Sequence, residues 1–369
     1  MTRRALLVIA ALALVPAARL LPPVRPAQAT VSALPKELSG PDLWKLSTEL
    51  SEPDGYFRSD NLVSNELFMQ QVIPDLIRVA KPGGVYMGVG PEQNFTYIAA
   101  IKPTMAFIVD IRRGNLQLHL MYKAIFELSA DRNDFLSRLF SMKKRTGLDR
   151  HSTIREIVTA YGAPLLKSEE LYKQNVAAIR ELLTKKLSLS AEDLKGVERV
   201  YQEFFSRGLD IHYEITPGSF GAFPTYGELM VATDLASVPR GFLATEENFG
   251  LVRELHRKNL IVPVVGNFGG PKAIRAVAKY IRSHDAVVSA FYVSNVEQYL
   301  LREGGIDQFC ASAATLPTDE TSTFIRSERG GFGPRGSSGA PRGFGGFPGN
   351  FSSRLHNMQL DLKGCATIR

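Results

Sequence analysis

The sequence is poor in the residue types on which metal centres and nucleophilic catalytic sites usually depend. Its 369 residues include only two cysteines, six histidines and one tryptophan. No Cys/His spacing suggests a zinc site, and no nucleophile-elbow motif or histidine-based triad occurs. Beyond the N-terminal segment, no apolar run approaches the roughly 20 residues that a membrane helix needs. The sequence therefore predicts no metal site and no transmembrane anchor in the mature chain.

The first 29 residues have the three parts of a cleavable secretory signal. A basic head at residues 1–4 precedes an apolar run at 5–15, and the segment ends in Ala27-Gln28-Ala29. We expect cleavage after Ala29 and a periplasmic or secreted mature chain. No cysteine lies near the cut, so a lipid anchor there is not supported.

Two alternatives remain for this segment. An uncleaved anchor would have to extend through Leu20-Leu21, across a stretch that Pro16, Arg19 and Pro22-Pro23 interrupt. The adjacent arginines of the head also resemble a twin-arginine export signal, although an ordinary basic head is the simpler interpretation. The twin-arginine route carries proteins that have already folded, so the choice bears on function.

The net charge of +7 lies at the two ends of the chain. The first 29 residues hold four arginines and no acid, and the tail from Arg326 holds seven basic and two acidic residues. Residues 30–325 are then close to −2, whereas a nucleic-acid binder shows a basic face on its domain. We expect no nucleic-acid partner.

Residues 326–369 are predicted to form a flexible tail. The stretch 330–350 (GGFGPRGSSGAPRGFGGFPGN) cannot bury a core. Its Arg-Gly-Phe composition is similar to that of RNA-binding tails, but for an exported chain we favour a solvated linker with weak adhesion to acidic surfaces. Cys310 and Cys365 can pair in an oxidising compartment and pin the tail, or remain free thiols; both states stay open.

Short apolar runs that alternate with helical patterns predict a doubly wound α/β fold with a mostly parallel sheet. The α/β domain is expected at 55–325, after a leader at 30–54 with a short helix around Trp44. A long helical insertion is expected at 115–208. The predicted strands are 85–89, 105–111, 210–215, 260–265 and 286–293, and further helices are predicted at 61–80, 94–101, 245–258 and 271–281.

The strongest local signal is the glycine turn that follows the first predicted strand. Gly88 and Gly90 allow a tight turn and a close approach of a ligand to the backbone. Asp110 lies 20 residues beyond Gly90, where a carboxylate can accept hydrogen bonds from both ribose hydroxyls of a nucleoside. A dinucleotide fingerprint needs a third glycine at the position of Gln93, so a pyrophosphate cofactor is disfavoured. A purely structural βα turn is the alternative.

With this turn, Asp110 and the strand order, the chain resembles class I S-adenosylmethionine-dependent methyltransferases over roughly residues 55–300. The whole pattern also resembles a group of uncharacterised bacterial proteins with this Rossmann-type fold. The family's acid two places before the first glycine is replaced by Tyr86, and Glu92, Ser59-Asp60-Asn61 or Asn65-Glu66 are candidates to take over its contacts. The resemblance implies S-adenosylmethionine as the cofactor, bound by Gly88, Gly90, Glu92, Asp110, Asp60 and Asn61.

Polar clusters after the other strands supply further candidates, because open α/β sheets build sites where strands end. Asn295, Glu297 and Tyr299 follow the last predicted strand, although Asn295 and Glu297 are also typical of a helix start. His119, early in the helix after Asp110, is a candidate acid or base, or else a buried helix residue. Arg113 is an additional candidate for an acidic substrate, unless it is a solvated surface residue. The predicted substrate-binding residues are Arg112, Asn115, Tyr226 and Asn267.

Two functions follow from this pattern. One is a methyltransferase-like enzyme that acts on a small molecule or an envelope component, since methyl transfer needs mostly positioning. The other is an exported, non-catalytic ligand-binding module that kept the fold and lost the cofactor. Tyr86 and the export signal favour the second, because S-adenosylmethionine is not expected outside the cytoplasm.

Overall fold

The computed structural model describes residues 34–162, 167–214, 223–329 and 351–365. The predicted signal at 1–29 and the glycine-rich stretch at 330–350 lie outside the described residues. The described residues all belong to one compact unit. Among them, no helix combines the length and the apolar character that a membrane span requires.

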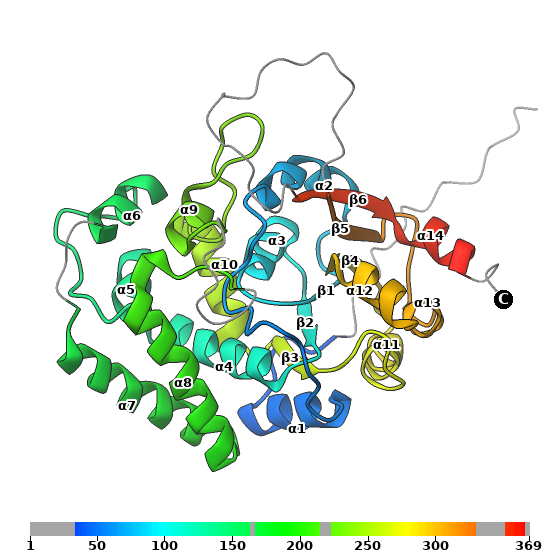
Figure 1. Cartoon of the computed structure of the whole chain (residues 1–369), viewed down its shortest axis with the longest axis horizontal. Coiled ribbons are helices and arrows are strands. Elements are labelled where there is room, and N and C mark those ends of the chain that lie inside the picture. Colours follow the sequence, from blue (N-terminus) through cyan, green and yellow to red (C-terminus); the bar gives the residue numbers. More distant parts are fainter. Residues whose placement is uncertain (1–33, 163–166, 215–222, 330–350, 366–369) are drawn as a thin grey trace, which may run out of the picture. The chain divides into compact units, whose positions relative to one another are not determined.

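A six-stranded, mostly parallel sheet forms the centre of the described fold (Figure 1). Its strand order is β3-β2-β1-β4-β5-β6, and only β6 runs antiparallel to its neighbour. The order reverses between β1 and β4, which makes their carboxyl ends the switch point of the sheet. The strands are β1 Val85–Gly88, β2 Met105–Asp110, β3 Ile261–Val265, β4 Val288–Ser294, β5 Thr323–Arg329 and β6 Phe351–Asn357.

Helices cover both faces of the sheet, because the crossovers before and after the switch point run in opposite directions. One face carries α3, α4 and α10, and the other carries α1, α11, α12 and α13 (Figure 1). The helices that contact the sheet or these layers are α1 Gly40–Leu50, α2 Ile73–Val79, α3 Gln93–Ile101, α4 Arg113–Leu128, α10 Glu246–Arg257, α11 Ala273–Ser283, α12 Val296–Glu303 and α13 Ile306–Ala313.

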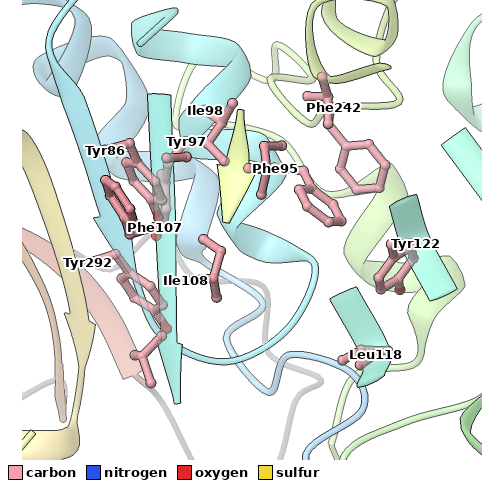
Figure 2. Packing of buried hydrophobic residues seen from close by; sticks show 14 of the residues in the cluster. Tyr86, Phe95, Tyr97, Ile98, Phe107, Ile108, Leu118, Tyr122, Phe242 and Tyr292 are labelled. Carbon is pink, nitrogen blue, oxygen red and sulfur yellow. The ribbon is translucent and has the colours of Figure 1, made fainter. Parts of the chain in front are cut away.

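Strands β1 to β4 are mostly apolar because helices cover both faces of the sheet. Every residue of β2 and of β3 is buried. On the α4 side, the ring of Phe95 lies 5.2 Å from that of Tyr122 and 5.5 Å from that of Phe242, in edge-to-face contacts (Figure 2). Figure 2 also shows Tyr86 and Tyr292, whose buried hydroxyls carry hydrogen bonds toward the site described below.

Four of the five predicted strands are confirmed as β1 to β4, but the strand predicted at 210–215 is wrong. The 3-10 helix Gly208–Asp210 (η2) leads into a segment with one isolated bridge, between His212 and Thr225. The place beside β2 is taken by β3. Ile211 is buried, and the ring of Tyr213 lies 5.0 Å from that of Phe223, so this apolar pattern reflects packing outside the sheet.

The helical insertion is confirmed but its bounds differ. α4 packs on β2 and β3 as an ordinary crossover helix, so the added structure begins after it. Ser168 and Ser190 accept hydrogen bonds from the first turns of α7 and α8 and fix where these helices begin. The added helices are α5 Arg132–Leu139, α6 Ile154–Gly162, α7 Glu169–Lys186, α8 Ala191–Arg207 and α9 Tyr226–Val231.

The prediction of a flexible tail from Arg326 onward is wrong for the part that the structure describes. β5 ends at Arg329, and 351–365 forms β6 and helix α14 Met358–Cys365. A disulfide joins Cys310 on α13 to Cys365 on α14, which answers the question that the sequence left open. These strands were missed because both carry many polar residues; only β6 lies at the edge of the sheet, where polar strands are common.

The predicted leader also packs on the sheet domain. α1 contacts β3, and the Ser47 hydroxyl donates a hydrogen bond to the carbonyl oxygen of Pro263. The 3-10 helix Met69–Val72 (η1) and α2 occupy the later part of the helix predicted at 61–80. Their position beside β1 and β6 places the loop before them at the switch point of the sheet.

Candidate functional site

A cavity lies at the carboxyl ends of β1 to β4, where the strand order reverses. Each of the four strands contributes a residue at its carboxyl end or just beyond it: Gly90, Asp110, Asn267 and Asn295. The cavity has a volume of about 130 Å³. Ligands of open α/β sheets bind at this place, which makes this cavity the candidate functional site.

Backbone conformation at the cavity favours a functional role. Gly90 has φ +77°, a left-handed value that glycine adopts without strain. Asn61 and Ser294, which also line the cavity, have φ of 46° and 51°. Left-handed non-glycine residues are strained and occur often at ligand sites. Three different segments therefore meet at the cavity in this conformation.

Gly88 has a structural role and does not line the cavity. A Cβ at Gly88 would lie 1.9 Å from Oδ1 of Asn94. The Asn94 amide donates to the carbonyl oxygens of residues 89–91 at 2.7–3.2 Å, and its Oδ1 accepts from the Tyr86 hydroxyl at 2.8 Å. Gly88 and Tyr86 thus hold the amide that shapes the turn, and this explains the tyrosine at the position where the methyltransferase pattern has an acid.

Asp110 lines the cavity with one carboxylate oxygen engaged. Its Oδ1 accepts the backbone N–H of Arg112 at 3.0 Å and lies 3.3 Å from the Arg112 Nε. Within the described residues, Oδ2 accepts no hydrogen bond. The Arg112 guanidinium also donates to the carbonyl oxygen of Asp60, so Arg112 connects the end of β2 to the loop on the other side of the cavity.

Arg113 is engaged away from the cavity. Its guanidinium makes a two-point contact with Asp193, with both N–O distances at 2.7 Å, and this raises the pKa of Arg113. Its backbone N–H donates to Asp54 at 2.6 Å. Arg113 therefore joins α4 to α8 and does not face the candidate site.

Glu92 is fully buried behind the turn. Burial raises its pKa to about 7, against the opposing effect of hydrogen bonds from backbone N–H groups, including that of Ser64 at 3.2 Å. Among the described residues, Oε2 of Glu92 has no hydrogen-bond partner. Ser64 lines the cavity and Glu92 does not, so Glu92 supports the wall of the site.

The residue at the third-glycine position, Gln93, links the cavity wall to a buried carboxylate. Its Nε2 donates to Glu66 at 3.3 Å, and its Oε1 accepts from the hydroxyl of Ser64. Glu66 also accepts from the hydroxyls of Tyr292 and Ser294, both at 2.7 Å. Gln93 and Glu66 hold together the loops that follow β1 and β4. Tyr292 opens the polar cluster 292–299 at the end of the last predicted strand, but only Asn295, Glu297 and Tyr299 of that cluster were predicted site residues.

The residues predicted around α12 divide into two groups. Asn295 and Tyr299 line the cavity. Asn295 also occupies the N-cap position of α12 and Glu297 lies in the first turn, as the alternative predicted, but the Asn295 side chain makes no capping bond. Glu297 lies outside the cavity. Its carboxylate accepts from Arg326 at 2.5 and 3.0 Å, which ties α12 to the C-terminal strands.

His119 and Tyr226 are buried behind the cavity. Nε2 of His119 donates to the carbonyl oxygen of Gly90 at 2.9 Å, and burial lowers the pKa of His119 to about 4, so the ring is neutral. Burial raises the pKa of Tyr226 well above its usual value. Asn115 is buried beside them, with no described partner for its Nδ2. These three residues do not line the cavity.

Asn267 lines the cavity in an orientation fixed by its own loop. Its Oδ1 accepts the N–H of Gly269 at 2.9 Å, and its backbone N–H donates to Glu52 at 3.0 Å. Glu52 also accepts the N–H groups of Lys272 and Ala273 at 2.8 Å and so caps the start of α11. Glu52 was not among the predicted site residues, because a single acid in a polar loop does not indicate a specific role.

Of the predicted site residues, seven meet at the cavity and seven do not. Two aromatic residues were missed, Tyr56 and Phe57, which line the cavity from the loop before α2; Tyr56 is 85% exposed. No cluster of metal-ligating side chains occurs in the described part of the chain. The cavity brings together Asn61, Gly90, Asp110, Arg112, Asn267, Asn295 and Tyr299, and leaves out Gly88, Glu92, Asp60, Asn115, His119, Tyr226 and Glu297.

One protein family matches the chain over most of its length. The matching model is described as a domain of unknown function, DUF7790, and it covers residues 61–150 and 144–341. The chain belongs to this family. No curated protein matches the chain. The matched residues include every strand that contributes to the cavity, whereas Tyr56 and Phe57, which also line it, precede the match.

Proposed function

We propose that the cavity binds a nucleoside-type ligand and that S-adenosylmethionine is that ligand, in a methyltransferase-like exported protein. The observation that carries the proposal is the carboxylate of Asp110. It lines the cavity at the end of β2, its Oδ2 accepts no hydrogen bond among the described residues, and Gly90 opens the turn opposite it. A ribose diol needs such an acceptor.

The chain's own residues suit such a ligand. Asp110 would accept the ribose hydroxyls while Arg112 holds the carboxylate in place. Asn267 and Asn295 supply amides, and Phe57, Phe268 and Tyr299 supply apolar surface for the base. The strand order and helix layers described above support the methyltransferase-like Rossmann comparison.

Methyl transfer would require little beyond positioning. An acceptor lone pair forms the new bond to the methyl carbon while the electron pair of the broken C–S bond goes to sulfur. His119 and Glu297 lie outside the cavity, whereas Glu303 and Tyr299 line it and could receive an acceptor proton or pass it to solvent. The role of His119 and Glu297 is to support the site.

The alternative function is a non-catalytic module that binds a ligand in the same cavity. Tyr86 favours it, because that residue is committed to Asn94. The export signal favours it as well. The Cys310–Cys365 disulfide is compatible with an oxidising compartment, and export by the twin-arginine route would let the protein leave the cytoplasm with its ligand bound.

Calorimetry on the mature chain tests the proposal. S-adenosylmethionine should bind, and Asp110→Asn should weaken binding roughly tenfold or more, because hydrogen bonds to a charged acceptor contribute about 1.5–3 kcal/mol each. Asp307→Asn removes an exposed acid of α13 that lies outside the cavity, and serves as the control. A methyl-donor assay with periplasmic small molecules separates the two functions, since turnover would exclude the non-catalytic module.

A further inference from the structure

A second cavity, of about 320 Å³, lies against the first. The two share the side chains of Tyr56, Phe57 and Asn61, which form a wall between them. The first cavity, about 130 Å³, is smaller than the 300–1,000 Å³ typical of small-molecule sites. The first cavity alone therefore leaves room for only part of a typical ligand. The adjacent second cavity can hold another molecule or the other end of the same molecule.

The helical insertion builds the far side of the second cavity. Glu203 and Arg207 come from α8, and Ile211, His212 and Glu214 come from the segment that follows it. The near side comes from the loop 56–62. The cavity thus exists only because the insertion lies over this loop, which gives the insertion a role in binding.

Most charges of the second cavity neutralise one another. The Arg207 guanidinium pairs with Glu203 at 3.0 Å and with Glu214. His212 donates the hydrogen of its Nδ1 to the carbonyl oxygen of Asp210 at 2.9 Å. The two carboxylates share one guanidinium, so these paired groups leave a net charge of −1 on the insertion side.

The loop side carries two charges that are not neutralised. Within the described residues, neither the Arg58 guanidinium nor the Asp60 carboxylate forms an ion pair. Arg58 is held at the wall by Tyr299, whose hydroxyl lies 3.4 Å from its Nη2 and whose ring centroid lies 5.7 Å from its Cζ. One residue separates Arg58 from Asp60, and both are exposed and line the same cavity.

We infer that the second cavity binds the zwitterionic group of an α-amino acid. Arg58 would pair with its carboxylate and Asp60 with its ammonium group. One unpaired cation and one unpaired anion, a short step apart on one loop, complement a zwitterion better than a molecule of either single charge. Arg58 also replaces Arg112 and Arg113 as the arginine able to contact an acidic group, since those two are held by Asp110 and Asp193.

The zwitterion has two possible sources, a free amino acid as a second substrate or the amino-acid end of the adenosyl ligand. The assignment to either source rests on the proposed function, whereas binding of the zwitterion itself does not. Calorimetry with three chain-matched probes tests the inference: norvaline, valerate and n-butylamine. Norvaline should bind the mature chain, and the two singly charged probes should bind at least about tenfold more weakly.

Variants localise the effect. Arg58→Gln and Asp60→Asn should each weaken norvaline at least about tenfold, while Arg302→Gln and Asp307→Asn, at exposed positions outside both cavities, should not. Equal affinity for the three probes, no binding of norvaline at millimolar concentration, or unchanged affinity in both loop variants would overturn the inference.

Two further measurements separate this inference from the proposed function. Asp110→Asn should leave norvaline binding intact, because Asp110 lines only the first cavity. Loss of S-adenosylmethionine binding with norvaline binding retained would therefore bear on the proposed function and not on this inference. Norvaline titrated into protein saturated with S-adenosylmethionine then identifies the source: retained binding indicates a free second substrate, and competition indicates the ligand's own amino-acid end. Both results support a zwitterion site.

Discussion

The imidazole of His119 donates its Nε2 hydrogen to the carbonyl oxygen of Gly90 at 2.9 Å, and so connects α4 to the turn that borders the cavity. The ring is 1% exposed. Its other nitrogen, Nδ1, has no partner among the described residues. His119, a candidate acid or base by its sequence position, is therefore placed to hold the cavity wall.

This contact predicts a loss of stability in acid. The pKa of His119 falls from 6.5 to about 4 on folding because burial disfavours the charged ring. The folded protein thus loses stability as the pH falls from 6.5 toward 4, by up to about 3 kcal/mol. Urea unfolding across this range measures it. His119→Gln keeps a donor without a titrating ring, and a pH profile unchanged in this variant would contradict the assignment.

Glu92 predicts the opposite slope. Burial raises its pKa from 4.5 to about 7, so the folded state favours the protonated carboxyl. Stability that is present below pH 4.5 is lost as the pH rises through 7, by about 3 kcal/mol at most. Glu92→Gln should remove this loss and be the more stable protein at pH 8. Exposed Glu254→Gln is the control; equal slopes in the two variants would refute the role of Glu92.

The turn at Gly90 predicts a combined loss of stability and binding. With φ +77°, an alanine there is strained, which costs about 1–2 kcal/mol. Added atoms meet only Asn61, at 3.4 Å, so the chain should still fold. Gly147→Ala has a similar φ of +80° far from the cavity and serves as the matched control. The two variants should have equal thermal stability, and only Gly90→Ala should bind S-adenosylmethionine more weakly. Equal binding by Gly90→Ala and Gly147→Ala would show that the turn does not contribute to the site.

The disulfide predicts that the C-terminal segment depends on oxidation. Cys310 and Cys365 close a loop with a sequence separation of 55 residues. Removal of such a link lowers the free energy of unfolding by about 2–4 kcal/mol. The double variant Cys310→Ser/Cys365→Ser should unfold at lower urea concentration, and a thiol reductant should shift the wild-type chain to the same midpoint. A reductant without effect on the wild-type chain would contradict a formed disulfide.

The sequence predicted strands β1 to β4, because buried parallel strands form nearly continuous apolar runs. The sequence prediction failed where buried residues do not belong to a strand, and where a strand carries many polar residues. Residues 210–214 alternate polar and apolar side chains as a strand does, yet Ile211 and Tyr213 pack outside the sheet. β5 and β6 carry many polar residues although they pair in full register. Such pairing depends on distant residues, which local patterns do not report.

The site residues that were predicted correctly are mostly those whose positions follow from the ends of the strands. Gly90, Asp110, Asn267 and Asn295 follow four neighbouring strands and therefore meet. Glu297 and Arg113 carry similar signals, but Arg326 and Asp193 engage them elsewhere. Tyr56 and Arg58 were missed because contacts with distant residues bring their loop to the site. Arg112 donates to the carbonyl oxygen of Asp60, the Gly55 N–H donates to the carbonyl oxygen of Ile111 at 2.9 Å, and Arg58 contacts Tyr299.

The central claim is that Asp110 receives a nucleoside at the switch point of the sheet. Calorimetric titration of S-adenosylmethionine into the mature chain, the Asp110→Asn variant and the Asp307→Asn control measures it most directly. The account predicts binding to the first and third proteins and binding weakened at least about tenfold in the second. Absence of binding to all three at millimolar ligand, or equal affinity in all three, would contradict it.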